Sequence, residues 1–210
     1  AFAQAPAARP AAPAPETPPG EWHSPARDHA QTRFSPLSQL TAANVAGLRP
    51  VWSFSTGVIG AHEGTPLVVG SVMYVHSPFP NAVYALDLTK PGSPIVWAWK
   101  VPPAVAKLTL PTGCCGEGSR GLGYHPSGKI LVPLLHGELV ALDAANGKEL
   151  WKVKNAEGRT GATMPGAPAV VKDLVIVGTG GSEYGTRGSI AAYDVETGKL
   201  VWRAFHTGPD

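Results

Sequence analysis

The stretch Ala141–Trp151 (ALDAANGKELW) recurs 51 positions later as Ala192–Trp202 (AYDVETGKLVW), with Asp, Gly and Trp at matching positions. A looser copy, Ala85–Trp97 (ALDLTKPGSPIVW), carries two extra residues in its turn. Each copy predicts a strand, a turn capped by the Asp side chain with Gly at positive φ, and a second strand ending on Trp. The Trp side chain offers a large flat surface for docking against the next unit.

A repeat of about 50 residues built of short strands is typical of β-propeller blades. Around the repeats, short apolar runs, many of them β-branched, are bounded by Gly, Pro, Asn or Asp, as strands are bounded by turns. These runs begin at Leu67, Val72, Val83, Ile130, Leu139, Leu174 and Ile190. We therefore predict an all-β protein, a β-propeller with tryptophan-docking blades. Two similar but unrelated hairpins are the alternative.

Two further segments bear on the architecture. Trp52, within Leu48–Phe54, is the candidate docking residue of a degenerate first blade. Together with the Trp residues of the three copies, it gives at most four units. Only the segment Ser35–Ala46 could hold a helical turn or two.

Residues 1–20 (AFAQAPAARPAAPAPETPPG) are mostly Ala and Pro, so we expect an extended tether, with a partial propeller in residues 21–210. Ala1-Phe2-Ala3 has the small-x-small form of a signal-peptidase site, which favours a periplasmic location. The 17 basic and 15 acidic residues form no basic block, which argues against a nucleic-acid partner. No run approaches the roughly 18 apolar residues of a membrane span.

Cys114 and Cys115 are adjacent, in the run PTGCCGEGSR at residues 111–120, and are the two cysteines of the chain. Adjacent Cα atoms lie about 3.8 Å apart, closer than the roughly 4.4–6.8 Å of an ordinary disulfide. If the two sulfurs were bonded, the small ring would be strained, and strain of this kind clusters at functional sites. Two thiols in a Gly-rich loop, or bridges to another chain, are the alternatives.

Stretches along nearly the whole chain resemble the periplasmic quinoprotein alcohol dehydrogenases of the methanol/ethanol type, which use pyrroloquinoline quinone (PQQ). The most specific feature is the vicinal cysteine pair followed by Arg120 inside a Trp-motif propeller. The other matching stretches are Trp22–Asp28, Arg33–Leu40, Ser55–Gly57, His62–Val69, Gly185–Gly188 and Val201–Asp210. Family members are similar to an eight-bladed propeller about three times this length. We therefore expect an N-terminal portion of about three to four blades.

The resemblance implies how PQQ, a flat anionic ortho-quinone, would be held. A disulfide between Cys114 and Cys115 would pack on one face of the cofactor. Arg120 would hydrogen-bond the quinone oxygens, where a fixed cation stabilises developing negative charge. Glu63 matches the glutamate that hydrogen-bonds the cofactor. Without the resemblance, Arg120 would be interpreted as a surface arginine and Glu63 as a strand-edge glutamate.

The loop after the expected strand Leu174–Val177 supplies the metal candidate. By resemblance, Glu183 coordinates a Ca²⁺ or lanthanide ion that also contacts PQQ, and hard cations prefer oxygen ligands. The residues before it match a stretch that lies against PQQ with its backbone donors: Gly180, Gly181 and Ser182. The alternative for Glu183 is a solvated loop glutamate.

Two positions depart from the family pattern. Pro165 stands where the family has a cofactor-binding Thr, with Thr163 two residues away. Gly180 stands where many relatives carry a Ser whose hydroxyl contacts PQQ. Each lost donor would weaken cofactor binding by about 1–3 kcal/mol if its partner is left unsatisfied.

The resemblance implies that the parent protein oxidises primary alcohols to aldehydes and passes electrons to a c-type cytochrome. The family's catalytic Asp, its other metal ligands and the Trp on the second face of PQQ map beyond Asp210. We therefore assign no catalytic residue and expect the chain alone to be inactive. The seven histidines show no metal-ligand spacing and are expected to be surface or packing residues. A non-enzymatic propeller scaffold that binds partner proteins, or a relative that has lost its cofactor, are the alternatives.

Overall fold

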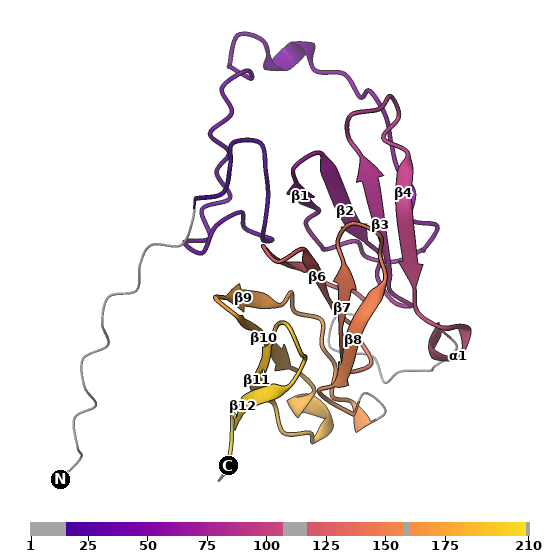
Figure 1. Cartoon of the computed structure of the whole chain (residues 1–210), viewed down its shortest axis with the longest axis vertical. Coiled ribbons are helices and arrows are strands. Elements are labelled where there is room, and N and C mark those ends of the chain that lie inside the picture. Colours follow the sequence, from indigo (N-terminus) through magenta and orange to yellow (C-terminus); the bar gives the residue numbers. More distant parts are fainter. Residues whose placement is uncertain (1–15, 107–116, 158–159, 209–210) are drawn as a thin grey trace, which may run out of the picture.

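Three four-stranded antiparallel sheets make up the fold (Figure 1). The computed structural model describes residues 16–106, 117–157 and 160–208. In each sheet the strands lie side by side in chain order, so we call the sheets blades 1, 2 and 3. Blade 1 contains β1 (Leu67–Val69), β2 (Val72–His76), β3 (Ala82–Asp87) and β4 (Ile95–Lys100); blade 2 contains β5 (Gly123–His125), β6 (Lys129–Pro133), β7 (Glu138–Asp143) and β8 (Glu149–Lys154); blade 3 contains β9 (Ala169–Val171), β10 (Leu174–Thr179), β11 (Ser189–Asp194) and β12 (Leu200–Phe205).

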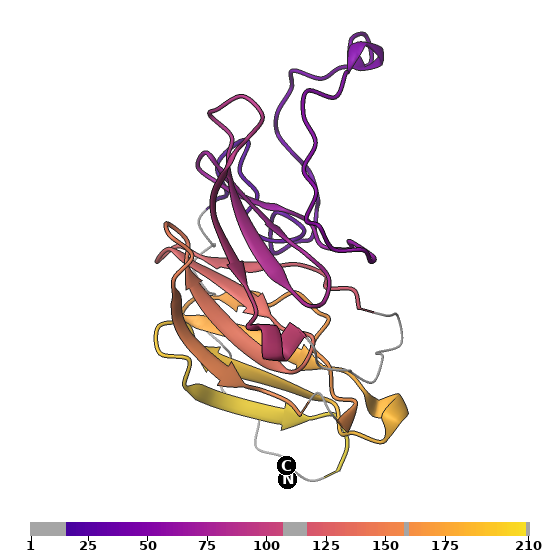
Figure 2. The ribbon, with the colours of Figure 1, turned by 90° about the vertical axis from the view of Figure 1, so that its right-hand side faces the viewer.

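The blades pack face to face, and the core lies between them (Figure 2). Blade 2 shows why, because its strands are buried on both sides. Ile130 and Val132 of β6 pack toward blade 1 with Leu67 and Val83, whereas the intervening Leu131 packs toward blade 3 with Val175. Successive residues of a strand point to opposite faces, so a strand buried on both faces is apolar at every position. The continuous apolar runs of the sequence therefore mark the middle strands of the blades.

The repeated motif forms the predicted capped turn in all three blades. The carboxylates of Asp87, Asp143 and Asp194 accept backbone N–H bonds two or three residues on, at 2.9, 2.7 and 2.8 Å respectively. The turn glycines have the expected positive φ: 75° at Gly92, 74° at Gly147 and 69° at Gly198. A register shift follows the motif Ala in each blade, at Ala85, Ala141 and Ala192. The expectation that the second strand ends on Trp was wrong, since β4, β8 and β12 each run three residues further.

Tryptophan docking is confirmed at both interfaces between blades. The indole N–H of Trp97 donates to Ala144 O of blade 2 at 3.0 Å, and that of Trp151 donates to Val195 O of blade 3 at 3.0 Å. Each ring covers the turn glycine of the next blade, since a Cβ on Gly147 would lie 2.5 Å from the Trp97 ring. The ring of Trp97 is therefore almost fully buried, at 9% exposed.

The segment before blade 1 differs from what the sequence predicts. Trp52 packs against the outer face of blade 1 with Tyr84 and Leu86, as a docking residue should, but no strand forms around it in the described part of the chain. The expected helical turns within Ser35–Ala46 are reduced to the 3-10 helix η1 (Val45–Gly47). The sequence did not predict helix α1 (Pro103–Ala106).

None of the helices in the described ranges combines the length and the hydropathy that a membrane crossing requires. The expected tether lies almost wholly in residues outside the described ranges.

Candidate functional site

The topology brings the predicted site residues to one end of the blades. The first strand of each blade (β1, β5 or β9), which we call the inner strand, begins at this end. The second strand runs antiparallel to it and therefore ends at this end. Glu63 precedes β1, Arg120 precedes β5, and Gly180 follows β10. The capped Asp turns lie at the opposite end, since Asp87 pairs with Val72 and not with His76. We call these two ends the site end and the docking end.

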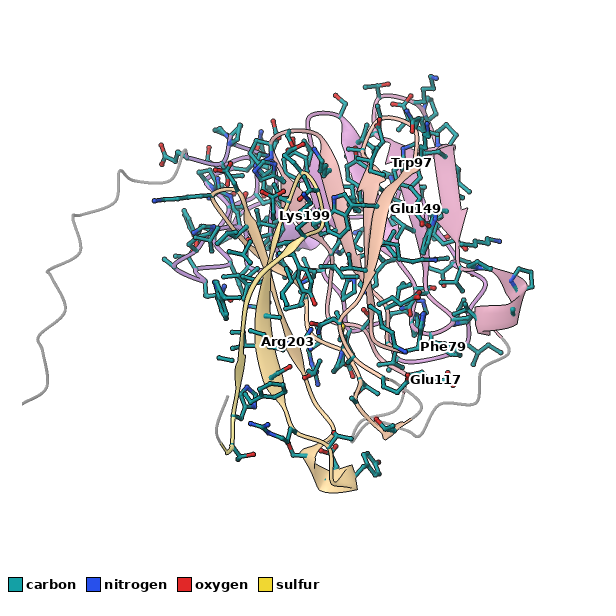
Figure 3. The ribbon with its side chains drawn as sticks, turned by 60° about the horizontal axis from the view of Figure 1, so that its bottom comes forward. Phe79, Trp97, Glu117, Glu149, Lys199 and Arg203 are labelled. Atoms are coloured by element: carbon teal, nitrogen blue, oxygen red, sulfur yellow. The ribbon has the colours of Figure 1, made fainter. Side chains whose placement is uncertain are left out.

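The pictures show the same division. In Figure 2 the 3-10 helix η3 (Ser182–Tyr184) lies on the right, while the β11–β12 hairpin turns on the left. In Figure 3 Phe79 and Glu117 lie close together at the lower end, and Trp97 and Lys199 lie near the upper end.

Backbone contacts between blades hold the site segments together. A parallel bridge joins Thr65 to Gly121, which connects the entry to blade 1 with the entry to blade 2. The N–H of Arg120 donates to Pro165 O at 2.8 Å, which connects blade 2 with the entry to blade 3. An antiparallel bridge joins Thr163 to Gly180. The segments carrying Glu63, Arg120 and Gly180 are therefore joined by a continuous series of backbone contacts, although they come from three blades.

Glu63 and Arg120 meet directly at the site end. Glu63 Oε2 lies 3.6 Å from Arg120 Nε, and the two side chains are 36% and 49% exposed. The carboxylate also packs on Gly118, where a Cβ would lie 3.0 Å from Glu63 Cδ. At 3.6 Å the pair is an ion pair without a hydrogen bond of ordinary length. Both charged groups therefore keep the capacity to hydrogen-bond a ligand.

The loop after β10 carries the other predicted residues. Gly181 has φ 111° and Gly185 has φ 79°, and between them Ser182, Glu183 and Tyr184 form the short helix η3. Gly181 must be glycine, because a Cβ there would lie 2.2 Å from Gly161 O. The Glu183 side chain is exposed.

The two departures from the family pattern have identifiable surroundings. The carbonyl oxygen of Pro165 accepts the hydrogen bond from the N–H of Arg120. This bond does not need the backbone N–H that proline lacks. Thr163 is buried. A Cβ placed on Gly180 would have the hydroxyl oxygen of Thr163 as its nearest neighbour, at 4.0 Å. The position of Gly180 therefore has room for a side chain, beside the hydroxyl of Thr163.

Two predictions are left open by the structure. Cys114 and Cys115 lie outside the described residues. Among the described residues, no three His, Cys, Asp or Glu side chains gather as a metal site would need, so Glu183 stands as a single candidate ligand.

His76 belongs to the site end but was not assigned to it from the sequence. Its ring is 7% exposed, and its Nε2 lies 3.1 Å from Ser119 O, one residue before Arg120. Burial lowers the pKa of His76 to about 4, although the hydrogen bond to Ser119 acts in the opposite direction. The available signal was a histidine at the end of the apolar run Val72–Val75, which predicts a packing residue and no more.

Comparison with known proteins gives matches along almost the whole chain. Residues 22–210 match the family described as "PQQ: Glucose/ethanol/alcohol dehydrogenase, beta-propeller domain". The lanthanide-dependent methanol dehydrogenase of Methylacidiphilum fumariolicum is 49% identical over 195 residues, which is 93% of this chain and 31% of the relative. Methanol dehydrogenase [cytochrome c] subunit 1 of Paracoccus denitrificans is 45% identical over 91% of this chain and 31% of its own length.

Solved structures agree with these sequence matches. A europium-containing methanol dehydrogenase superposes with a TM-score of 0.86 at 49% identity, over 93% of this chain and 33% of that chain. A quinohemoprotein alcohol dehydrogenase from Comamonas testosteroni superposes with a TM-score of 0.80 at 41% identity, over 88% of this chain and 27% of that chain. The chain thus spans about a third of the length of the relatives it matches.

Proposed function

Because the chain belongs to the glucose/ethanol/alcohol dehydrogenase family with a PQQ-type β-propeller, we propose that its site end binds PQQ in a primary-alcohol dehydrogenase. The protein that contains these residues would oxidise primary alcohols to aldehydes and pass electrons to a c-type cytochrome. The names of relatives that act on methanol or pair with cytochrome c support this reaction class.

One observation carries the proposal. Glu63 and Arg120, 57 positions apart in the sequence, lie 3.6 Å apart, and backbone contacts connect Arg120 through Pro165 and Thr163 to Gly180. A scaffold that binds partner proteins through its blades has no need for this pairing of opposite charges.

The donor set fits the chemistry of PQQ. When bound, PQQ supplies an ortho-quinone that accepts two electrons. Arg120 offers guanidinium N–H donors to the quinone oxygens, and a fixed cation there stabilises negative charge as it develops. Glu63 is an acceptor for the N–H of the cofactor and balances the charge of Arg120. The glycines at 180 and 181 leave the backbone open to close approach.

Thr163 is the residue best placed to replace the hydroxyl that Gly180 lacks. Its hydroxyl lies beside the position that a side chain at Gly180 would occupy. We assign it this compensating role, so one hydroxyl donor remains beside Gly180.

Glu183 would be one ligand of a Ca²⁺ or lanthanide ion. Ions of this kind take six or more oxygen ligands, so one exposed carboxylate holds them only together with the cofactor and other groups. The europium-containing and lanthanide-dependent relatives support a lanthanide. Titration of the protein with Ca²⁺ and with La³⁺ distinguishes the two ions.

The cellular location completes the proposal. We place the protein in the periplasm, where the oxidising environment would allow Cys114 and Cys115 to form a disulfide. Titration of thiols in the denatured, unreduced protein tests this: no reactive thiol is expected, and two per chain would contradict the disulfide.

The test uses the full-length protein, prepared without PQQ and titrated with PQQ in the presence of Ca²⁺ or La³⁺. We expect saturable binding followed by absorbance, and oxidation of primary alcohols by an artificial electron acceptor only when PQQ and metal are both present. Arg120→Ala should weaken PQQ binding at least tenfold, because a charge-assisted hydrogen bond is lost. Arg49→Ala, which removes an exposed arginine that donates to the nearby carbonyls of Ala46 and Leu48, is the matched control. Absence of PQQ binding in the wild-type protein would overturn the proposal.

A further inference from the structure

We propose that His76 is a positioning residue, which holds Arg120 and Glu63 at the separation that cofactor binding needs. This inference rests on the proposed function, because it concerns the same site. It involves no contact between His76 and the cofactor.

The segment that His76 holds is Glu117–Gly121, which we call the strap. Three backbone contacts fasten it: Phe79 N–H donates to Glu117 O at 3.0 Å, Arg120 N–H donates to Pro165 O at 2.8 Å, and Gly121 bridges to Thr65. His76 adds a side-chain bond to the carbonyl of Ser119, in the middle of the strap. This bond acts on the residue directly before Arg120.

The same ring also contacts the segment that carries Glu63. A Cβ on Gly64 would lie 1.9 Å from Cε1 of His76 and 2.8 Å from its Nδ1. Gly64 has no positive φ, so this contact, and not backbone conformation, is what requires glycine there. His76 therefore touches the neighbour of Glu63 on one side and the neighbour of Arg120 on the other.

The protonation state of His76 is defined by its surroundings. A carbonyl oxygen can only accept, so Nε2 must carry the proton that is donated to Ser119 O. The low pKa, caused mainly by burial, keeps the ring neutral at physiological pH. A neutral donor suits this position, because it adds no second positive charge beside Arg120.

Packing alone would not require a histidine. An apolar side chain of similar size would fill the same space, but the buried carbonyl of Ser119 would then lose its donor. Unsatisfied buried carbonyls are costly, so the strap would shift to find another partner. A shift of the strap moves Arg120 relative to Glu63.

The test compares three substitutions in the full-length protein. His76→Gln places an amide N–H near the position of Nε2 and keeps the donor. His76→Asn places it near Nδ1, and His76→Met fills the space without any donor. We expect PQQ dissociation constants within about threefold of wild type for His76→Gln, and raised about tenfold for His76→Asn and His76→Met, as one lost hydrogen bond implies.

The control removes a comparable buried bond at the docking end. Tyr74→Phe deletes the hydroxyl that donates to Ala144 O at 3.0 Å, also between blades 1 and 2. We expect it to lower the melting temperature of the PQQ-free protein while leaving PQQ affinity unchanged. If His76→Asn and His76→Met behave like this control, His76 only supports packing and the proposal fails.

The outcomes separate this inference from the proposed function. Wild-type protein that binds PQQ, with all three variants binding equally well, overturns the role of His76 alone. Wild-type protein that does not bind PQQ overturns both. If His76→Met does not fold, the comparison of His76→Gln with His76→Asn gives the same decision.

Discussion

The docking end and the site end of the blades are held together by different kinds of contact. At the docking end one kind of connection recurs along the chain: Trp97 of blade 1 bonds to blade 2 and Trp151 of blade 2 bonds to blade 3, each at the residue after the motif Asp. At the site end the connections between blades differ from one another, as in the backbone bridge of Thr65 with Gly121 and the side-chain bond of His76 to Ser119 O.

This difference separates stability from function. The docking end buries large aromatic surface, so substitutions there should change the free energy of unfolding. The site end leaves Glu63 and Arg120 partly exposed, so substitutions of these two residues should change ligand affinity with little effect on stability. Substitutions at each end, compared by the free energy of unfolding and by PQQ affinity, test this separation.

Trp97→Ala should have the largest effect on stability. Loss of a buried aromatic side chain costs about 3–5 kcal/mol in the free energy of unfolding, measured by urea denaturation. Trp97→Phe keeps most of the packing and loses the N–H bond to Ala144 O, so about 1–2 kcal/mol is expected. Similar losses for Ala and Phe would mean that the indole N–H, and not the ring, dominates the docking.

Gly147→Ala should cost about 2–3 kcal/mol, because its Cβ would meet the Trp97 ring at 2.5 Å while φ is 74°. Gly92→Ala is a close control, since Gly92 has φ 75° and open space around it. It should cost about 1 kcal/mol through backbone strain alone. Equal losses would show that the contact between Trp97 and the turn adds nothing.

Acid should weaken the site end through His76. Its pKa is 6.5 in the unfolded chain and about 4 in the folded protein, so below pH 6.5 only the unfolded chain readily takes up the proton. Stability therefore falls between pH 6.5 and 4, by about 2 kcal/mol at pH 5. The free energy of unfolding of His76→Gln should fall less than that of wild type between pH 7 and 5. Identical pH dependence in both proteins would contradict this burial of His76.

Gly180→Ser should improve PQQ binding without changing stability. Gly180 has no positive φ, and the nearest atom to a Cβ would be Thr163 Oγ1 at 4.0 Å, so the serine fits. One added hydrogen bond is worth about 1 kcal/mol, a gain of roughly fivefold in affinity. Gly181→Ser is the contrasting variant and should disrupt the loop, because its Cβ would collide with Gly161 O. Weaker binding in Gly180→Ser would argue against a cofactor at this surface.

Arg120→Ala should have the smallest effect on the free energy of unfolding, below about 0.5 kcal/mol. Its ion pair with Glu63 is half exposed and 3.6 Å long, and pairs of this kind contribute little. A melting-temperature shift as large as that of Trp97→Phe would break the distinction between the two ends.

The sequence predicted the docking end well and the site end less well, for a physical reason. The Asp143 turn, the positive φ of Gly147 and the docking of Trp151 depend on local chemistry that repeats, so the pattern is visible in one chain. The short inner strands β5 (GYH) and β9 (AVV) were missed, whereas β1 (LVV), of the same length, was predicted; β5 and β9 each begin on a small residue, which weakens the strand preference of so short a run.

The site residues became predictable only through resemblance. The closeness of Glu63 to Arg120 depends on how blade 1 stacks on blade 2, which no local spacing encodes. His76 was described as a surface or packing residue, and its burial agrees with the second description. Its bond to Ser119 O could not be foreseen, because it joins positions 43 residues apart that no repeat relates.

Docking through tryptophan also gives the blades a direction. Trp97 and Trp151 both dock onto the repeat that follows them, and Trp202, at the same motif position, is 40% exposed on the outer face of blade 3. Each blade thus has a donor side and a receptor side, and both are specified by the same few motif residues. Blades of this design can be duplicated or exchanged within an array while every junction keeps its fit, which makes the array a modular unit for lengthening by gene duplication.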